Sequence, residues 1–145
     1  MAVGIPGSGK TTYLKPYAQQ TQAAYICADD IRQEILGDPS DQTQNARIWE
    51  IVYARAQQAL QSGSVVIDGI GTDPAYRRND VRRFRPLADQ VIAFWFDTPL
   101  DVCLERNRTR ERQVNAAFVR RAYRQLQVHP PSLAEGFDEI RIIKS

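Results

Sequence analysis

The residues from Gly4 to Thr11 match a phosphate-binding pattern, G-x-x-x-x-G-K-[ST], at every fixed position. Glycine tolerates backbone angles and close approaches that a β-carbon forbids, so the amide N–H groups of such a loop can surround phosphate oxygens. In this pattern Lys10 reaches the β- and γ-phosphates, and the Thr11 hydroxyl ligates Mg²⁺. The sequence therefore predicts a nucleoside triphosphate site. Its predicted phosphate-binding residues are Gly7, Ser8, Gly9, Lys10, Thr11 and Thr12.

A candidate metal-binding acid, Asp68, directly follows the apolar segment 65–67. An acid at the end of a buried strand can reach Mg²⁺ or its bound water and share the metal with Thr11. The alternative is that Asp68 only caps the loop 69–71, in which two glycines allow a ligand or another backbone to come close. We expect Asp68 to belong to the metal site.

A second group of candidate residues is Asp29-Asp30-Ile31-Arg32. A carboxylate within hydrogen-bond reach of a hydroxyl can act as general base in phosphoryl transfer, and an arginine beside it can hold an anion of the acceptor. Aspartate is also common as a helix cap, so this pair of acids could serve only to start a helix. We predict Asp29 as the base, Asp30 as the cap and Arg32 as the acceptor-binding cation.

Four arginines alternate with other residues between positions 106 and 112. Such a segment suits a lid, at about 106–115, that closes over the triphosphate and excludes water. Arginine there can stabilise the charge that builds on the transferring phosphoryl group. Arg106 and Arg110 would lie one helical turn apart and are the predicted nucleotide contacts, with Arg110 also catalytic. For Arg108 and Arg112 a solvated turn is an equally good interpretation.

Short apolar runs alternate with longer amphipathic ones, the pattern of a parallel sheet covered by helices on both faces. The predicted strands are 2–5, 24–28, 65–67, 91–96 and 139–143. The predicted helices are 10–20, 31–36, 43–62, 74–84, one from Thr98 with Pro99 at its first position, and one that Asn115 caps. The length of 145 residues fits one domain over 1–145.

Ligands of such sheets bind beyond the carboxyl ends of the strands. Three acids stand there in the predicted order, namely Asp29, Asp68 and Asp97. The first strand leads into the glycine-rich loop and a helix follows it, which is the setting that the phosphate-binding pattern requires. This context argues against a chance glycine-rich turn.

The composition is that of an ordinary globular protein, with 43% apolar and 25% charged residues and a net charge of +2. No apolar run is long enough to span a bilayer and no signal peptide is recognisable, so we expect a cytoplasmic protein without a membrane partner. Sixteen of the nineteen basic residues are arginines, which suits phosphate contacts but equally fits a GC-rich genome. The basic stretch 77–85 is expected to be the exposed face of a helix, with nucleic-acid contact as the alternative.

These motifs resemble the small P-loop kinase family that includes 5′-hydroxyl polynucleotide kinases, zeta-toxin-like kinases and chloramphenicol phosphotransferase. The resemblance covers almost the whole chain and is strongest to the kinase domain of phage-type polynucleotide kinases. The matching segments are G-x-P-G-S-G-K-[ST]-T at Gly4–Thr12, acid-acid-x-R at Asp29–Arg32, and R-N-x-x-R at Arg106–Arg110. It implies a kinase-like P-loop NTPase fold, a three-layer sandwich with a five-stranded, mostly parallel sheet and an arginine-rich lid.

In that family the first acid of the second motif is the general base and its arginine binds a phosphate of the acceptor strand, roles that would fall on Asp29 and Arg32. The lid arginines contact the nucleotide phosphates, which corresponds to Arg106 and Arg110. The third strand's acid is usually followed by Thr or Ala and then Asn. Here Asp68 is followed by Gly-Ile-Gly at 69–71, so acceptor contacts from this loop do not transfer.

The sequence thus predicts an ATP- and Mg²⁺-dependent phosphotransferase that acts on an acceptor hydroxyl, with a 5′-hydroxyl polynucleotide end as the first candidate. A small-molecule kinase for a nucleoside, sugar or antibiotic is the alternative within the same class. A nucleotide-dependent switch or a bare ATPase is the alternative from another class. ATP is expected because none of the three lysines lies in an [NT]-K-x-D guanine-binding motif. The oligomeric state is left open.

Replacing Lys10 by Ala should weaken ATP binding by about tenfold or more, because a hydrogen bond to a charged group contributes ~1.5–3 kcal/mol. Titration calorimetry with ATP and Mg²⁺ measures the dissociation constant directly. Retained affinity would contradict the assignment of Gly4–Thr11 as a phosphate loop.

Overall fold

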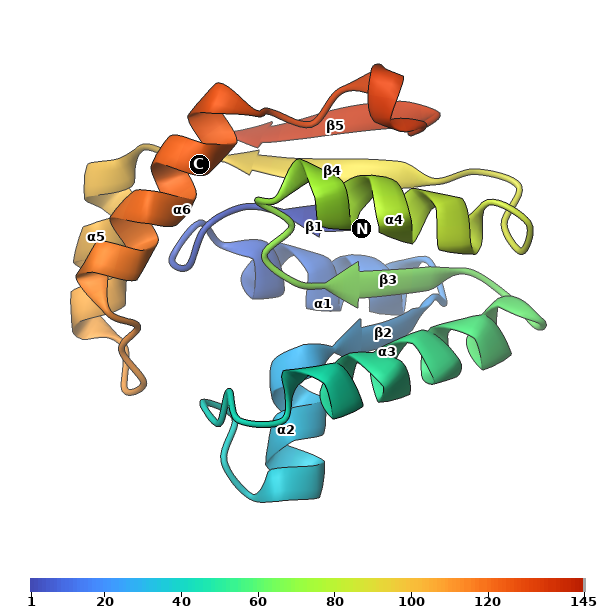
Figure 1. Ribbon diagram of the computed structural model, residues 1–145, viewed down its shortest axis with the longest axis horizontal. Coiled ribbons are helices and arrows are strands. Elements are labelled where there is room, and N and C mark those ends of the chain that lie inside the picture. The colour runs from blue at the N-terminus through green and yellow to red at the C-terminus, as the bar shows by residue number, and fades with distance from the viewer. Residues whose placement is uncertain (145) are drawn as a thin grey trace.

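The chain is described by a computed structural model over residues 1–144, and the last position of the predicted range 1–145 lies outside the described residues. Short strands alternate with helices along the chain (Figure 1). The elements are β1 (Ala2–Val3), α1 (Lys10–Gln20), β2 (Ala24–Cys27), α2 (Ala28–Leu36), α3 (Asn45–Leu60), β3 (Val65–Asp68), α4 (Pro74–Phe84), β4 (Ile92–Asp97), α5 (Leu100–Thr109), α6 (Ala116–Val128), the 3₁₀ turn η1 (Leu133–Glu135) and β5 (Glu139–Lys144).

The strands pair in parallel and form two hydrogen-bonded ladders, β2–β3 and β1–β4–β5. They follow one another in one layer, in the order β2, β3, β1, β4, β5 (Figure 1). β1 has only two residues, and the loops after β1 and β3 meet through a hydrogen bond from the Gly4 N–H to the Ile70 carbonyl over 2.9 Å. The predicted α/β class with a parallel sheet is confirmed, although the ladder is interrupted between β3 and β1.

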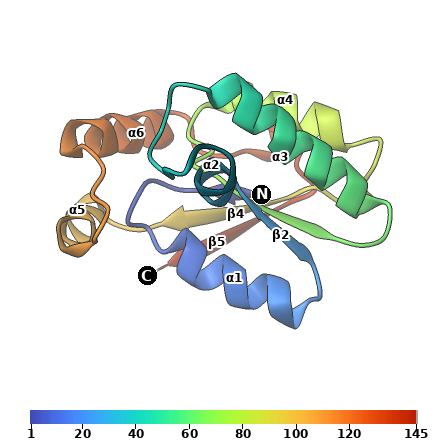
Figure 2. The ribbon, with the colours of Figure 1, turned by 90° about the horizontal axis from the view of Figure 1, so that it is seen from below.

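Helices cover both faces of the sheet, as the sequence predicts. α1 lies on one face, and α3 and α4 lie on the other (Figure 2). α1 buries Leu14 and Ala18 in a cluster with residues of β3 and β4. α3 buries Ile48, Val52 and Ala56, which recur every four residues and so share one stripe of the helix.

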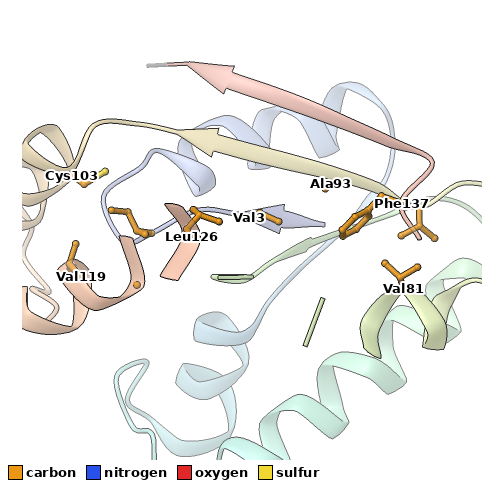
Figure 3. Close-up of a cluster of buried hydrophobic side chains, with 10 residues drawn as sticks. Val3, Val81, Ala93, Cys103, Val119, Leu126 and Phe137 are labelled. Carbon is orange, nitrogen blue, oxygen red and sulfur yellow. The ribbon is translucent and has the colours of Figure 1, made fainter. Parts of the chain in front are cut away.

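The two helices after β4 join the sheet through a separate apolar cluster (Figure 3). Cys103 of α5 and Val119 and Leu126 of α6 are buried in one cluster with Val3 of β1 and Ala93 of β4. α5 and α6 stand near the carboxyl ends of the strands, toward which the arrows of β4 and β5 point (Figure 1). The connection between these two helices is therefore held close to the edge where ligands of parallel sheets bind.

Several sequence-based boundaries are confirmed. α1 and α4 run over the predicted residues, and Asp73 caps α4 by accepting a hydrogen bond from the Ala75 N–H over 2.8 Å. Asn115 caps α6 in the same way, through hydrogen bonds from the two N–H groups of residues 117 and 118. Each of these two caps involves only residues next to it in the chain, so a local pattern is enough to predict it.

The prediction that Asp30 caps α2 is wrong. The helix begins at Ala28, so Asp29 and Asp30 both lie in its first turn, and Cys27 is the residue before the helix. Acidic residues in a first turn are favoured by the helix dipole without being caps. The earlier start changes the site, because it places Asp29 on a rigid helix close to the end of β2.

The prediction that Thr98 caps α5 with Pro99 at its first position is also wrong. α5 begins at Leu100 and Pro99 occupies the cap position. Thr98 is buried, and its hydroxyl donates a hydrogen bond to the carbonyl oxygen of Ser8 over 3.0 Å. A long-range contact with the phosphate loop has taken the place of the local cap.

Arg77 is buried, with 1% of its surface exposed, rather than part of an exposed basic face. It forms an ion pair with Glu135 of η1 and donates hydrogen bonds to the carbonyl oxygens of Gly71, Thr72 and His129. This guanidinium joins α4, the loop after β3 and the segment after α6. Arginine with its five donors can satisfy several carbonyls at once where lysine cannot.

Two other arginines of this stretch have partners: Arg83 lies over the ring of Tyr53, and Arg85 pairs with Asp138. Arg78, Arg82 and Arg83 are exposed, as expected for this face of the helix. Among residues 1–144 no helix has the length and apolar character needed to cross a bilayer.

Replacing Glu135 by Gln should lower the free energy of unfolding by about 3 kcal/mol, because the buried charge of Arg77 loses its partner. Urea unfolding followed by circular dichroism measures this difference. Glu34→Gln is the matched control, since Glu34 forms an exposed ion pair with Arg55 and its loss should hardly change the midpoint. Equal midpoints for the two variants would contradict a structural role of the buried pair.

Candidate active site

A cleft of about 1680 Å³ opens at the carboxyl ends of the strands, between the phosphate loop, α2, α3 and the connection from α5 to α6. Most of the predicted site residues line it. They are Gly7, Gly9, Lys10, Thr11, Thr12, Asp29, Arg32, Asp68, Arg106 and Arg110. Two predicted residues behave differently: Ser8 is buried at 1% exposure, and Asp97 pairs with Lys144 of β5.

The phosphate loop has the backbone that its glycines allow. Gly7 and Gly9 have φ angles of +83° and +92°, in the left-handed region that side chains avoid. A β-carbon on Gly7 would lie 2.4 Å from the carbonyl oxygen of Cys103, so the loop touches the backbone of α5. Gly9 immediately precedes α1, whose N-terminal N–H groups face the same space as the loop.

Lys10 is half-buried within this loop, and its ammonium group donates a hydrogen bond to the carbonyl oxygen of Ile5 over 2.9 Å. Burial lowers the pKa of Lys10 to about 8. The negative charge of Asp68 opposes this shift, and the positive charge of Arg110 adds to it. A phosphate group bound in the loop would favour the charged form of Lys10 and so raise its pKa again.

Thr11 and Asp68 meet as predicted, although they are 57 residues apart in the chain. The Thr11 hydroxyl donates a hydrogen bond to Asp68 Oδ2 over 2.7 Å, and Asp68 is buried at 4% exposure. Hydroxyl and carboxylate oxygens are the ligands that Mg²⁺ takes beside phosphate oxygens and water, so these two residues fit the ion. When bound there, Mg²⁺ would neutralise charge on the β- and γ-phosphates.

Tyr25 is a site residue that sequence reasoning missed. Its hydroxyl donates a hydrogen bond to the same Asp68 oxygen over 2.5 Å. Burial and this hydrogen bond raise the pKa of Tyr25 far above its ordinary value, so the hydroxyl remains a donor. Tyr25 lies two residues before Cys27, the partner of Asp68 in the ladder, and so on the same face of β2. The only sequence signal was a tyrosine in an otherwise apolar run.

Asp29 and Arg32 form the predicted pair, one turn apart on α2. Arg32 Nη1 lies 2.7 Å from Asp29 Oδ1, and Arg32 Nη2 donates a hydrogen bond to Asn45 Oδ1 over 2.9 Å. Arg32 is 6% exposed, so in this conformation it chiefly fixes the carboxylate. Sequence reasoning did not find Asn45, which lies at the start of α3, on the far side of a connection that carries no clear pattern.

Arg112 is the second arginine that pairs with Asp29, and the sequence did not predict this contact. Its Nη2 atom lies 2.6 Å from Asp29 Oδ2, so each carboxylate oxygen of Asp29 faces a different guanidinium. Arg112 comes from the connection after α5 and also lines the cleft. Of the two interpretations given for Arg112, a solvated turn or a residue of the lid, the structure therefore favours a specific contact.

The arginine-rich segment is partly helical, because α5 continues to Thr109. Arg106 lies in the last turn of α5 and donates a hydrogen bond to the Gly7 carbonyl over 3.3 Å. Arg110 follows the helix in an extended conformation, so the two do not form the predicted helical pair. Asn107 is buried and exchanges two hydrogen bonds with the backbone of Val114, at 2.6 and 2.9 Å.

The hydrogen bonds between Asn107 and Val114 close the ends of the loop 108–113 and leave its tip free to carry arginines. Asn107 is thus a packed residue in an otherwise polar segment, because its amide can both donate to and accept from a backbone.

The wall of the cleft beyond Asp68 is aromatic. A β-carbon on Gly69 would lie 3.1 Å from the ring of Trp49, so this ring packs closely against the backbone of the loop after β3. The rings of Trp49 and Tyr53 lie 5.7 Å apart, and the Tyr53 hydroxyl donates a hydrogen bond to Asp80 over 2.6 Å. These residues lie on α3 and α4 and line the same cleft as the phosphate loop.

A family model described as an AAA domain, AAA_33, matches residues 1–129. The chain belongs to this family. The match contains the phosphate loop, the Asp29–Arg32 segment and the loop between α5 and α6. The expected membership of a P-loop kinase family is thereby confirmed.

Solved structures have the same fold. A chain of the Pnkp1/Rnl/Hen1 RNA repair complex aligns with a TM-score of 0.78 and 22% identity over 94% of this chain, which spans 45% of that chain's length. Shikimate kinase from Bacteroides thetaiotaomicron aligns with a TM-score of 0.62 and 17% identity, over 96% of this chain and 82% of the other. A gluconokinase from Sinorhizobium meliloti 1021 aligns with a TM-score of 0.61 and 15% identity, over 99% and 79%. At these identities the likeness shows a kinase-like P-loop fold.

ATP binding should take up protons above pH 8, because Lys10 loses its charge near that pH in the free protein and regains it beside phosphate. Affinity should accordingly fall as the pH rises beyond 8, with an uptake of about three quarters of a proton at pH 8.5. Calorimetry in two buffers of different ionisation enthalpy measures the uptake. Lys10→Met is the control and should abolish it; an uptake that persists in this variant would refute the assignment to Lys10.

Proposed function

We propose that this protein is an ATP- and Mg²⁺-dependent kinase that transfers the γ-phosphoryl group of ATP to an acceptor hydroxyl. The observation that carries the proposal is the position of Asp29, a carboxylate held by Arg32 on the wall of the cleft that also contains the phosphate loop. A switch protein or a bare ATPase needs no arginine such as Arg32 beside this carboxylate, because water is its only acceptor. Residues 1–145 form the kinase domain in this proposal, with residues 106–115 as its lid.

In the proposed reaction the acceptor hydroxyl gives its proton to Asp29 while its oxygen attacks the γ-phosphorus. The bond between this phosphorus and the bridging oxygen of ADP breaks, and ADP leaves with that oxygen. Lys10 and the backbone N–H groups of the loop hold the phosphates throughout. Arg106 and Arg110 stabilise the charge on the transferring group, and Thr11 and Asp68 hold the metal.

The first candidate for the acceptor is a 5′-hydroxyl polynucleotide end. The likeness to a chain of an RNA repair complex favours it. The size of the cleft is also consistent with it. The volume of about 1680 Å³ exceeds the ~300–1,000 Å³ of ordinary small-ligand sites and leaves room for an acceptor beside ATP. The ring of Trp49 on the cleft wall is of the kind on which nucleobases stack.

A small-molecule acceptor is the alternative, and the likeness to shikimate kinase and gluconokinase favours it. The deciding experiment incubates the protein in excess with labelled ATP and a set of acceptors. The set contains a 5′-hydroxyl oligonucleotide, the same oligonucleotide with a 5′-phosphate, nucleosides and sugars. Label on the first alone supports the polynucleotide acceptor; label on a nucleoside or a sugar alone refutes it and supports the alternative.

Replacing Asp29 by Asn should lower phosphoryl transfer by about two or more orders of magnitude and leave ATP affinity intact, because only the base is lost. Turnover is followed as ADP release with the best acceptor of the set. Asp97→Asn is the matched control, the same substitution at a strand end where the carboxylate pairs with Lys144 outside the cleft. Full turnover in Asp29→Asn would remove Asp29 from the mechanism.

A further inference from the structure

The loop between α5 and α6 reaches across the cleft to the candidate base. Its ends are fixed by the two hydrogen bonds between Asn107 and Val114, and Gln113 Nε2 donates another hydrogen bond to the Arg108 carbonyl over 2.9 Å. From this closed loop Arg112 extends to Asp29 on α2, 83 residues away in the sequence. The contact therefore joins the arginine-bearing loop to the acceptor side of the site.

The two arginines on Asp29 differ in burial. The Arg32 side chain is 7% exposed and is also held by Asn45, whereas the Arg112 side chain is 34% exposed and the Asp29 side chain 43%. Ion pairs at such exposure are weak and screened by solvent. Arg32 is thus a permanent partner of the carboxylate, and Arg112 is one that a ligand can displace.

A general base must accept a proton from a hydroxyl at about 2.6–3.2 Å. In this structure each oxygen of Asp29 already has a guanidinium group at 2.6–2.7 Å. Asp29 in this state is poorly able to activate either an acceptor or water.

We propose that Arg112 masks Asp29 while the acceptor site is empty, and that the acceptor displaces Arg112 from the carboxylate. The inference rests on the proposed role of Asp29 as the base. Its consequence is protection of ATP. With Asp29 free and no acceptor present, a water molecule could give a proton to Asp29 and attack the γ-phosphorus. The bond from this phosphorus to ADP would then break, and ATP would be lost as ADP and phosphate.

The contact itself is tested in the free protein by hydrogen–deuterium exchange, without any assay of activity. Arg112→Gln and Asp29→Asn should both speed exchange of the amides in the loop 108–113, because each breaks the same pair. Arg120→Gln is the matched control, an identical change of charge at an exposed position of α6. Exchange that is unchanged in both variants would overturn the proposal, whatever the protein catalyses.

The masking role is tested by ATP turnover with and without acceptor. Arg112→Gln should raise acceptor-free hydrolysis and lower the acceptor KM by up to about fivefold each, which converts to ~1 kcal/mol, with kcat for transfer retained. In the double variant Arg112→Gln with Asp29→Asn the gain in hydrolysis should vanish. Conversely, equal losses of hydrolysis and transfer in Arg112→Gln would mean that Arg112 acts on the transferring phosphoryl group, which overturns masking.

These outcomes separate the two hypotheses. If no acceptor is phosphorylated but Arg112→Gln raises hydrolysis through Asp29, the masking role is supported and the proposed kinase function fails. If phosphoryl transfer depends on Asp29 but Arg112→Gln changes neither hydrogen–deuterium exchange nor ATP hydrolysis, the kinase function is supported and the masking role fails.

Discussion

The close contact between the phosphate loop and α5 is the constraint on which the site depends. The carbonyl of Cys103 leaves no space for a β-carbon at Gly7, and the Thr98 hydroxyl binds the carbonyl of Ser8. The same contact fixes where α5 leaves β4, and α5 carries Arg106 over the loop. The donor site and the base of the lid are therefore one packed unit rather than two parts that meet by chance.

Three charged groups of the cleft have polar partners within the protein. Lys10 binds a backbone carbonyl, Asp68 accepts from Thr11 and Tyr25, and Asp29 is held between two arginines. Burying unpaired charge is costly, so each of these contacts limits the cost of keeping the site preformed. A ligand must replace such contacts, and the weakest of them, at exposed groups, are the ones that can respond to it.

Local chemistry explains most of what could be predicted from the sequence. The phosphate loop, the caps at Asp73 and Asn115, and the alternation of strands and helices each depend on neighbouring residues, so they can be derived from short patterns. Two of the wrong predictions have a long-range cause. Thr98 serves the phosphate loop instead of capping, and Arg77 is buried by Glu135, 58 positions further on. No local pattern contains such partners.

The sequence by itself determined the triphosphate loop, the parallel α/β class and the strand ends at which Asp29 and Asp68 stand. Only the tertiary structure decided which polar groups meet at those ends: Tyr25 contacts Asp68, and Arg112 joins Arg32 on Asp29. The physical reason is the parallel sheet. It brings the carboxyl ends of distant strands to one edge, and side-chain contacts across that edge depend on packing between elements that spacing along the chain does not reveal.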